Sequence, residues 1–332
     1  MAARIGVIGA GAWGTALAQA MATDGSEVLL WARESQLVEE VNTQHSNSLF
    51  LPNADLSPTI RATGDLAELA SPPVLLAVVP AQFLGAVLAE LPRTECDLVL
   101  CAKGIEQSTG RLTGEVARDA MPEARIAVLS GPTFAHEVAA GLPTAVTLAC
   151  SGGREQWQRL SPVLARPALR PYFTDDVVGA EIGGAVKNVL AIACGVVDGM
   201  ELGQNARAAL IARGYAEMLR FGASRGANAE TLAGLCGLGD LVLTCSSTSS
   251  RNFSLGRALG QGETLEEALA GKATVAEGAA TAPILAEIAM REGIEMPIVA
   301  AVDRLLAGET TAAQVAEALL SRPLKAEQDR TA

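Results

Sequence analysis

The fold of this chain follows from one stretch near its start, Arg4-Ile5-Gly6-Val7-Ile8-Gly9-Ala10-Gly11-Ala12-Trp13-Gly14. A short apolar run leads there directly into glycines with the spacing G-x-G-x-x-G, and the run 13–21 that follows is typical of a helix. In a dinucleotide-binding turn, Gly9 would permit the tight bend, Gly11 would let the backbone approach a pyrophosphate, and Gly14 would let the helix pack on the strand. The helix would then direct its first N–H groups at the pyrophosphate.

A second strand completes this unit. Gly25 can end the helix, and the run Glu27-Val28-Leu29-Leu30-Trp31-Ala32 is typical of a buried strand. Together the elements span the roughly 30 residues of a βαβ unit. Glycine spacing of this kind also occurs in purely structural turns, so that alternative stays open at this point.

Arg33 and Glu34 follow the second predicted strand. An arginine here offers planar, charged donors to the 2′-phosphate that distinguishes NADP from NAD, whereas a carboxylate would bind the ribose 2′-hydroxyl of NAD. Arg33 therefore favours NADP, and Glu34 keeps NAD as the alternative. The simplest other interpretation of Arg33 is a solvated loop charge.

Strand-like and helix-like runs alternate through the first half of the chain. The helix-like runs include 82–91 and 112–120. Such an alternation predicts an α/β fold with a doubly wound, parallel sheet of Rossmann type. The further strand-like runs are short, partly β-branched and bounded by turn residues, and they cover 74–79, 98–102, 126–130, 144–149 and 170–174.

The pattern changes near Asp176. Apolar residues recur at helical spacing in 177–197 and 206–221, with little that resembles a strand, which predicts an all-α C-terminal domain. We expect a dinucleotide-binding domain over residues 1–175, a helical substrate and catalytic domain over 176–324, and a polar tail over 325–332.

Composition narrows the class of protein. A net charge of −12 argues against a nucleic-acid surface, which needs clustered lysine and arginine. Six cysteines without C-x-x-C spacing and only two histidines disfavour a zinc site and a disulfide framework. The first apolar stretch is better explained as strand, turn and helix than as a signal peptide, and the uncharged run 189–197 is too short for a membrane span. We therefore expect a cytoplasmic protein with no metal and no membrane span.

Residues that directly follow strands of a parallel sheet converge on one cleft. Lys103-Gly104 follows one predicted strand, and Gly131-Pro132-Thr133-Phe134-Ala135 follows another. Lys103 would bring a cation to this cleft, and Gly131 would let backbone N–H groups approach a ligand. A surface loop charge is the other interpretation of Lys103.

The helical half contains a second lysine in an unusual setting, Gly183-Gly184-Ala185-Val186-Lys187-Asn188. Each glycine costs about 1 kcal/mol relative to alanine inside a helix, so the pair suggests that a backbone or a ligand lies close. Desolvation among apolar residues would lower the pKa of Lys187 and suit it to acid/base catalysis. The alternative is a lysine whose ammonium extends into solvent.

A polar cluster farther along could hold a phosphate. Arg251 would bring charge and forked donors, and Ser250 and Asn252 would add neutral donors. Asp240, in Gly237-Leu238-Gly239-Asp240, could order Lys187 or a substrate hydroxyl. A flexible polar loop is the other interpretation of this cluster.

These motifs in this order resemble one family, the bacterial NAD(P)-dependent glycerol-3-phosphate dehydrogenases, over roughly residues 3 to 320. Ala12 departs from the family pattern, because many members carry serine there and this chain loses that hydroxyl contact to phosphate. The motifs that carry the resemblance are the glycine turn, Lys103-Gly104, Ser130-Gly131-Pro132-Thr133-Phe134-Ala135, Gly184-Ala185-Val186-Lys187-Asn188, Gly237-Leu238-Gly239-Asp240, Ser250-Arg251-Asn252 and Val275-Ala276-Glu277-Gly278.

The resemblance implies a role for each site residue. Lys187 would be the acid/base catalyst. Substrate would contact Lys103, Gly131, Thr133, Lys187, Asp240, Ser250, Arg251 and Asn252. The cofactor would contact Gly9, Gly11, Ala12, Trp13, Gly14, Arg33, Lys103, Ala135, Arg251, Val275 and Glu277.

The implied reaction is hydride transfer from NADPH or NADH to dihydroxyacetone phosphate, giving sn-glycerol 3-phosphate for glycerophospholipid synthesis. A homodimer is one assembly that the sequence leaves open. Two rival functions also remain at this point: a related hydroxy-acid dehydrogenase, which would need a carboxylate clamp in place of the phosphate site, and a dinucleotide-sensing protein without catalytic activity. The second rival would have little use for Lys187, Lys103 and Asp240 together.

Overall fold

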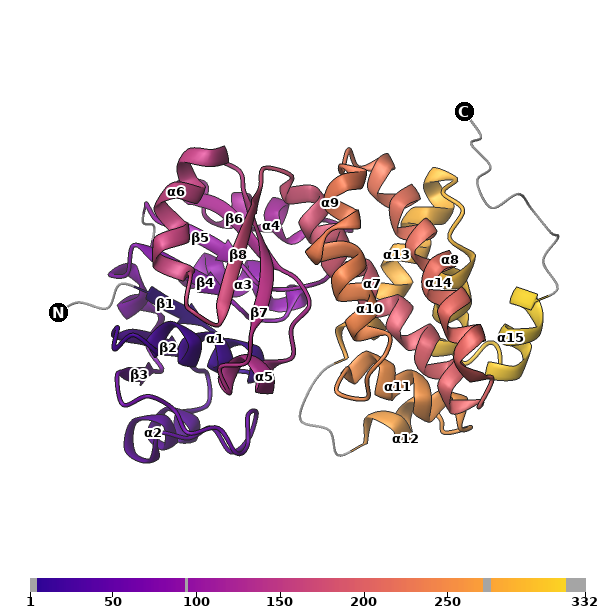
Figure 1. The fold of residues 1–332 in the computed structure, drawn as a ribbon, viewed down its shortest axis with the longest axis horizontal. Coiled ribbons are helices and arrows are strands. Elements are labelled where there is room, and N and C mark those ends of the chain that lie inside the picture. The colour runs from indigo at the N-terminus through magenta and orange to yellow at the C-terminus, as the bar shows by residue number, and fades with distance from the viewer. Residues whose placement is uncertain (1–4, 93–94, 271–275, 321–332) are drawn as a thin grey trace.

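The computed structural model describes residues 5–92, 95–270 and 276–320. Figure 1 shows two halves side by side, a sheet flanked by helices in the first half of the chain and a group of helices in the second. The predicted combination of a Rossmann-type sheet and an all-α C-terminal part is confirmed. The predicted tail over 325–332 lies outside the described residues.

The sheet has eight strands in the order β3-β2-β1-β4-β5-β6-β7-β8. Neighbours from β3 to β6 pair in parallel, and the direction of the winding reverses between β1 and β4. In open α/β sheets ligands bind at such a reversal, outside the carboxyl ends of the strands. The strands are β1 (Ile5–Ile8), β2 (Val28–Trp31), β3 (Ile60–Thr63), β4 (Val74–Ala77), β5 (Asp97–Leu100), β6 (Arg125–Ser130), β7 (Thr144–Cys150) and β8 (Leu169–Thr174).

The sheet departs from the sequence prediction at its two edges. β7 pairs antiparallel with β6, and β8 follows β7 in parallel. The connection from β6 to β7 contains only the five-residue helix α5 (Ala135–Ala139), which spans about 7 Å and cannot return the chain along a strand of about 20 Å. At the other edge, β3 has only four residues and an exposed Arg61, so it lacks the apolar run that marked the other strands.

Helices cover both faces of this sheet. The central strands β1, β2, β4 and β5 are buried along their full length, as expected for strands covered on both sides. The helical elements of this half are α1 (Ala12–Ala22), α2 (Ser35–Gln44), η1 (Leu66–Ala70), α3 (Ala81–Glu90), α4 (Thr113–Ala120), α5 and α6 (Gly153–Leu164).

The second half is built around α7 (Val177–Gly199), which packs against α8, α11 and α13. Val189 and Ile192 on α7 are fully buried in the core of this half. The other helical elements are α8 (Gly203–Ser224), α9 (Ala229–Ala233), η2 (Leu235–Gly239), α10 (Asp240–Thr244), α11 (Arg251–Gly260), α12 (Leu265–Leu269), α13 (Glu277–Glu292), α14 (Pro297–Leu306) and α15 (Ala312–Leu320).

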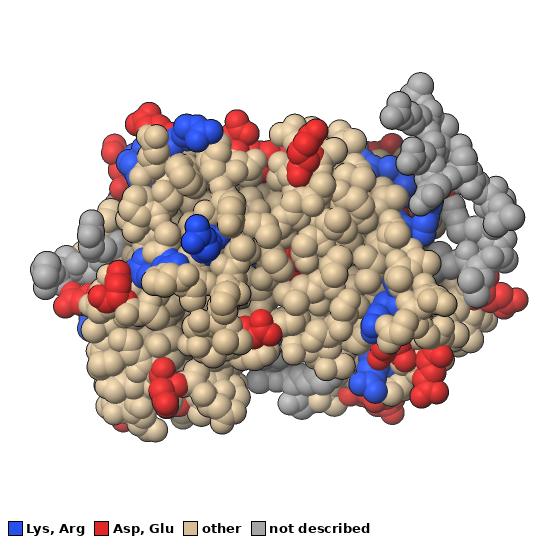
Figure 2. Space-filling model, in the orientation of Figure 1, with Lys and Arg blue, Asp and Glu red and all other residues tan. Residues whose placement is uncertain are grey.

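By length and apolarity α7 could cross a membrane, the one such helix in the described residues. The most apolar 18-residue stretch of α7 is 94% buried inside the protein, so α7 has the surroundings of a core helix. Charged side chains on the face drawn in Figure 2 lie scattered, with acidic and basic residues interspersed.

Candidate active site

The glycine turn after β1 has the geometry that its sequence predicts. Gly9 has φ +111°, a conformation that residues with a side chain rarely adopt. Gly14 lies so close to this bend that a Cβ on it would stand 1.8 Å from the carbonyl oxygen of Gly9. The first turn of α1 can therefore approach β1 only because residue 14 is glycine.

Open space lies beside Gly11, the N-cap residue of α1. Among the described residues, a Cβ on Gly11 would meet no atom within 4 Å, and no side chain is hydrogen-bonded to the first N–H groups of α1 as a cap. The indole nitrogen of Trp13, one position into the helix, is buried and has no partner among the described residues. Free N–H groups at a helix N-terminus, beside an open approach, fit the pyrophosphate of a dinucleotide.

Arg33 lies two residues beyond the end of β2, where the adenosine ribose of a dinucleotide would be held. Its side chain is 80% exposed and pairs with Glu34 across 3.1 Å. The guanidinium is therefore accessible to a ligand, in competition with a surface ion pair that contributes little to stability.

Two lysines from different halves of the molecule bind one carboxylate. Lys187 Nζ on α7 donates to Asp240 Oδ1 across 2.8 Å, and Lys103 Nζ, after β5, donates to Asp240 Oδ2 across 2.7 Å. Lys187 also donates to Thr244 Oγ1 across 2.9 Å, and Lys103 to the carbonyl oxygen of Gly131 across 3.2 Å. We call Lys103, Lys187, Asp240 and Thr244 the charged cluster. Its formation shows that Lys103 is no surface loop charge and that Lys187 does not extend into solvent.

Burial and charge set the protonation of the charged cluster. Burial lowers the pKa of Lys187 to about 8, although the neighbouring Asp240 carboxylate opposes this shift. Burial acts to raise the pKa of Asp240, whose side chain is fully buried, but the charges of Lys103 and Lys187 outweigh it and hold that pKa below its ordinary value. Near neutral pH the cluster therefore contains an ionised carboxylate and a lysine that can release a proton.

Gly183, four residues before Lys187, allows α7 to pack closely against η2. A Cβ on Gly183 would stand 2.4 Å from the carbonyl oxygen of Cys236 in η2, so the backbone of η2 packs directly on α7 there. The next element, α10, begins with Asp240, and this contact brings its carboxylate to Lys187. Gly183 thus serves a close approach of backbone, one of the two reasons that the sequence suggested. A Cβ on Gly184 would instead stand 3.2 Å from side-chain atoms of Lys103 and Ser130.

The loop after β6 lies beside Lys103. Gly131 has φ +157°, and Thr133 Oγ1 donates to the Gly131 carbonyl oxygen across 3.3 Å. Ala135 begins α5 and packs against the core of the sheet half. Lys103, Gly131 and Thr133 therefore lie together at the carboxyl ends of β5 and β6, where a substrate would meet a cofactor bound at β1.

The predicted phosphate cluster lies at the start of α11 and not in a loop. Ser250 is buried and caps α11 by accepting a hydrogen bond from the Phe253 N–H across 3.2 Å. Asn252 Oδ1 accepts from the Gly278 N–H across 2.9 Å, which joins α11 to the start of α13. Arg251 is exposed at the first position of α11.

Glu277 brings a second carboxylate toward the same lysines. It begins α13 and accepts a hydrogen bond from the backbone N–H of Ala81, at the start of α3. Burial raises the pKa of Glu277 to about 7, against the charges of Lys103, Lys187 and Arg251. This position beside three cations was not evident from the sequence. Val275, also predicted near the cofactor, lies outside the described residues.

Thr244 was missed by sequence reasoning. Its hydroxyl joins both Lys187 Nζ and Asp240 Oδ1, the latter across 3.1 Å. The signal that could have identified it is its spacing of four residues from Asp240, because residues i and i+4 of a helix lie on one face.

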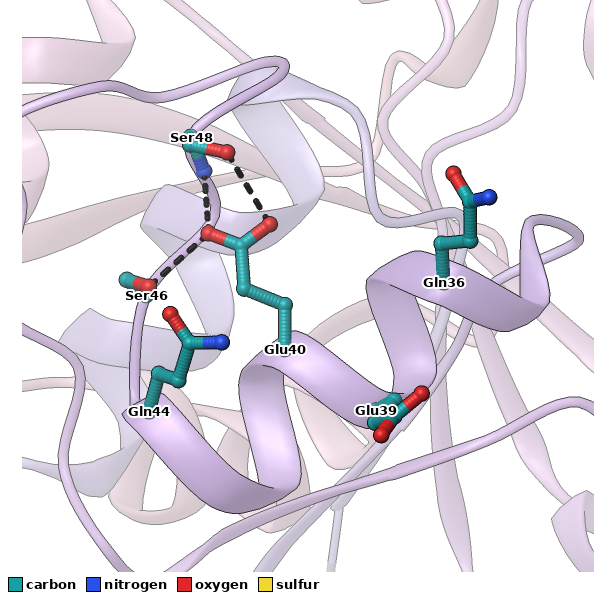
Figure 3. Close-up of a pocket in the computed structure, with 6 residues that line it drawn as sticks. All are labelled: Gln36, Glu39, Glu40, Gln44, Ser46 and Ser48. Carbon is teal, nitrogen blue, oxygen red and sulfur yellow. Dashed lines mark hydrogen bonds between the residues drawn. The ribbon is translucent and has the colours of Figure 1, made fainter.

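A surface hollow on α2 is separate from the charged cluster. Figure 3 shows Glu40 there accepting hydrogen bonds from Ser46 and Ser48, so these groups satisfy one another. The hollow is lined by Gln36, Glu39, Glu40, Gln44, Ser46 and Ser48.

Comparison with known proteins identifies the family. Residues 4–156 match the model of the NAD-dependent glycerol-3-phosphate dehydrogenase N-terminus, and residues 176–317 match the model of the C-terminus of the same family. The chain belongs to the NAD-dependent glycerol-3-phosphate dehydrogenase family. The resemblance inferred from the motifs is thereby confirmed.

Full-length relatives agree with this assignment. A glycerol-3-phosphate dehydrogenase [NAD(P)+] of Erythrobacter litoralis is 68% identical over 332 residues, which is 100% of both chains. One of Novosphingobium aromaticivorans is 67% identical over 98% of this chain and 99% of its own. The crystal structure of a glycerol-3-phosphate dehydrogenase from Coxiella burnetii has a TM-score of 0.91 and 40% identity, covering 96% of this chain and 98% of that one.

Proposed function

We propose that this member of the glycerol-3-phosphate dehydrogenase family catalyses reversible hydride transfer between NAD(P)H and dihydroxyacetone phosphate, giving sn-glycerol 3-phosphate. The observation that carries the proposal is the charged cluster, in which a buried lysine of lowered pKa meets a second lysine on one carboxylate. A protein that only senses a dinucleotide has no need of such an acid/base group. The full-length relatives named as NAD(P)+ enzymes support the same activity.

When bound, the nicotinamide ring supplies the hydride or accepts it. Lys187 donates its proton to the oxygen of the substrate carbonyl as that carbon is reduced, and takes the proton back in the oxidation direction. Asp240 and Thr244 orient the Lys187 ammonium through the hydrogen bonds described above. Lys103 stabilises negative charge on the same substrate oxygen, an effect that contributes several kcal/mol where donors are fixed in advance.

Arg251 and Asn252 anchor the substrate phosphate at the start of α11. The guanidinium of Arg251 is accessible there, and Asn252 keeps its amide NH₂ group for a ligand because its carbonyl oxygen binds Gly278. Ser250 contributes its hydroxyl proton, since its oxygen lone pair serves the helix cap. Thr133 and the Gly131 backbone close the opposite side of the substrate.

The cofactor site combines the glycine turn with side chains from both halves. Arg33 binds the 2′-phosphate of NADP, which makes NADP the preferred cofactor and NAD the second. Arg251 contacts both cofactor and substrate. The full proposed set is Gly9, Gly11, Ala12, Trp13, Gly14, Arg33, Lys103, Ala135, Arg251, Val275 and Glu277.

Residues 1–175 form the proposed cofactor domain and residues 176–324 the proposed substrate domain. The protein acts in the cytoplasm and supplies glycerophospholipid synthesis, and a homodimer is the assembly to test. The high identity to named bacterial relatives supports this role, and sedimentation of the purified chain tests the dimer.

The oxidation of NADPH, followed by its absorbance after addition of dihydroxyacetone phosphate, tests the function. We expect turnover with dihydroxyacetone phosphate and a kcat/KM lower by about 100-fold or more with phosphate-free dihydroxyacetone, because the charged contacts to the phosphate are lost. Oxidation of NADPH with a 2-keto acid, and none with dihydroxyacetone phosphate, would instead show a hydroxy-acid dehydrogenase.

A further inference from the structure

A buried carboxylate on α7, Glu181, connects the two halves at a distance from the charged cluster. Glu181 is 6% exposed, and its Oε1 atom accepts hydrogen bonds from Thr113 Oγ1 across 2.7 Å and from the Gly114 N–H across 2.5 Å. Both donors belong to the first turn of α4, which lies in the sheet half. A side chain of the helical half thus caps a helix of the other half.

The N-terminus of α4 needs a capping side chain from another element, because its own N-cap residue is apolar. The N-cap residue of α4 is Leu112, whose apolar side chain cannot accept a hydrogen bond from the free N–H groups of the first turn. A negative charge at a helix N-terminus is also favourable because of the helix dipole. The fit is close, since a Cβ on Gly114 would stand 3.1 Å from Glu181 Oε2. Glu181 therefore holds α7 in one position against α4.

That position matters because the same helix carries Lys187. Glu181 precedes Lys187 by six residues, which is about 9 Å along a helix axis. Lys187 must meet a substrate whose other contacts include Lys103 of the sheet half. A slide or rotation of α7 against the sheet half would move the Lys187 ammonium relative to Lys103 and the bound substrate.

We propose that Glu181 is a positioning residue, which by capping α4 sets the register of α7 and thereby the place of Lys187 relative to the sheet half. The inference rests on the proposed role of Lys187 as the proton donor. Misplacement of a catalytic group by about 1 Å can cost 10²-fold in rate. Loss of the cap therefore lowers kcat more than it changes substrate or cofactor binding.

The surroundings of Glu181 agree with a fixed carboxylate. Burial raises the pKa of Glu181 to about 7, although the hydrogen bonds from Thr113 and Gly114 and the charge of Arg118 oppose the shift. Glu115 and Arg118 of α4 and Arg225 after α8 line the same small cavity beside it. The two bonds to α4 are thus maintained at the cost of desolvating the carboxyl group.

Glu181→Ala and Glu181→Gln test the inference, with Glu217→Ala as the matched control. Glu217 is also a buried carboxylate that caps a helix, accepting from the N–H groups of Ile298 across 2.7 Å and Val299 across 3.1 Å, and both of these donors lie in the helical half. We expect Glu181→Ala to lower kcat by about 10- to 100-fold with both KM values within about threefold. Glu181→Gln retains an acceptor oxygen and should recover most of kcat. Glu217→Ala should lower the melting temperature and leave kcat within about threefold of the wild type, because the two hydrogen bonds to Ile298 and Val299 that it removes lie within the helical half.

A wild-type kcat for Glu181→Ala, whether or not its melting temperature falls, would overturn the inference. An equal loss of kcat in Glu181→Ala and Glu217→Ala would do so as well. Should Glu181→Ala fail to fold, Thr113→Val removes one of the two donors and should lower kcat about threefold or more, whereas an unchanged kcat would count against Glu181. Hydrogen exchange tests this inference independently of the proposed function, because it needs no turnover of dihydroxyacetone phosphate. Glu181→Gln and Glu181→Ala should differ in the protection of the backbone amides of residues 183–188. Equal protection in the two variants would contradict the inference.

Discussion

The glycine turn after β1 and the charged cluster around Asp240 are built in opposite ways. The turn comes from six consecutive residues, and its shape depends on backbone conformation at Gly9 and on the missing side chain of Gly14. The cluster joins Lys103, Lys187 and Asp240, which are far apart in the chain, and its chemistry depends on burial. The glycine turn is thus determined locally, and the charged cluster exists only when both halves are packed together.

Substitutions in the two regions should therefore impair different steps of catalysis. A substitution in the turn should weaken cofactor binding and leave the acid/base chemistry of bound substrate intact. A substitution of Lys187 should slow the acid/base chemistry and leave cofactor binding intact.

Lys187→Ala should have the largest effect, because it removes the proton donor. We expect kcat for dihydroxyacetone phosphate reduction to fall by about 10²- to 10⁴-fold, the usual range for a general acid, with the dissociation constant of NADPH changed less than about threefold. Steady-state kinetics and titration of NADPH fluorescence measure the two quantities. A large loss of NADPH affinity would mean that the two regions are not separable.

Gly14→Ala and Gly11→Ala compare two positions of the same turn. A Cβ at residue 14 would clash with the Gly9 carbonyl oxygen, so we expect Gly14→Ala to lower the free energy of unfolding by about 1–3 kcal/mol together with cofactor affinity. A Cβ at residue 11 enters open space, where only the cofactor would meet it. Gly11→Ala should therefore keep wild-type stability in denaturant titrations and bind NADPH about tenfold more weakly, since the backbone can no longer approach the pyrophosphate closely. Unchanged NADPH binding by Gly11→Ala would remove the pyrophosphate from this position.

Arg33→Ala should have the smallest effect, because its side chain is exposed and solvent weakens its interactions. We expect kcat/KM for NADPH to fall about fivefold, the loss of one solvent-exposed charged contact to the 2′-phosphate, while kcat/KM for NADH stays within about twofold. Glu34→Gln is the control that removes the ion pair and keeps the guanidinium. Equal losses for NADPH and NADH would show that Arg33 does not recognise the 2′-phosphate.

Features that depend on local sequence could be predicted, and features that depend on contacts between distant residues could not. The turn, the strands of the sheet half and α7 were predictable, because each depends on spacing within one short run. The sheet edges were not: β3 has an exposed arginine, and the direction of β7 depends on the length of its connection. Such features are properties of tertiary packing and leave no local pattern.

The cluster was predictable only as a set of candidates. The apolar neighbours of Lys187 indicated its burial, and Asp240 was one suggested partner. That Lys103 would occupy the second oxygen of the same carboxylate could not be inferred, because the contact joins residues in different halves. The contact of Glu181 with α4 could not be predicted from the sequence either, because it also joins residues in different halves.

The pH dependence of single-turnover reduction tests most directly whether the buried Lys187 is the proton donor. The donor must be protonated, and burial places the pKa of Lys187 at about 8. When NADPH-loaded enzyme is mixed with saturating dihydroxyacetone phosphate, the rate constant should be constant below about pH 7 and should fall about tenfold for each pH unit well above about pH 8, while the rate of glycerol 3-phosphate oxidation rises through the same range. A reduction rate that stays constant from neutral pH to about pH 10 would contradict the assignment.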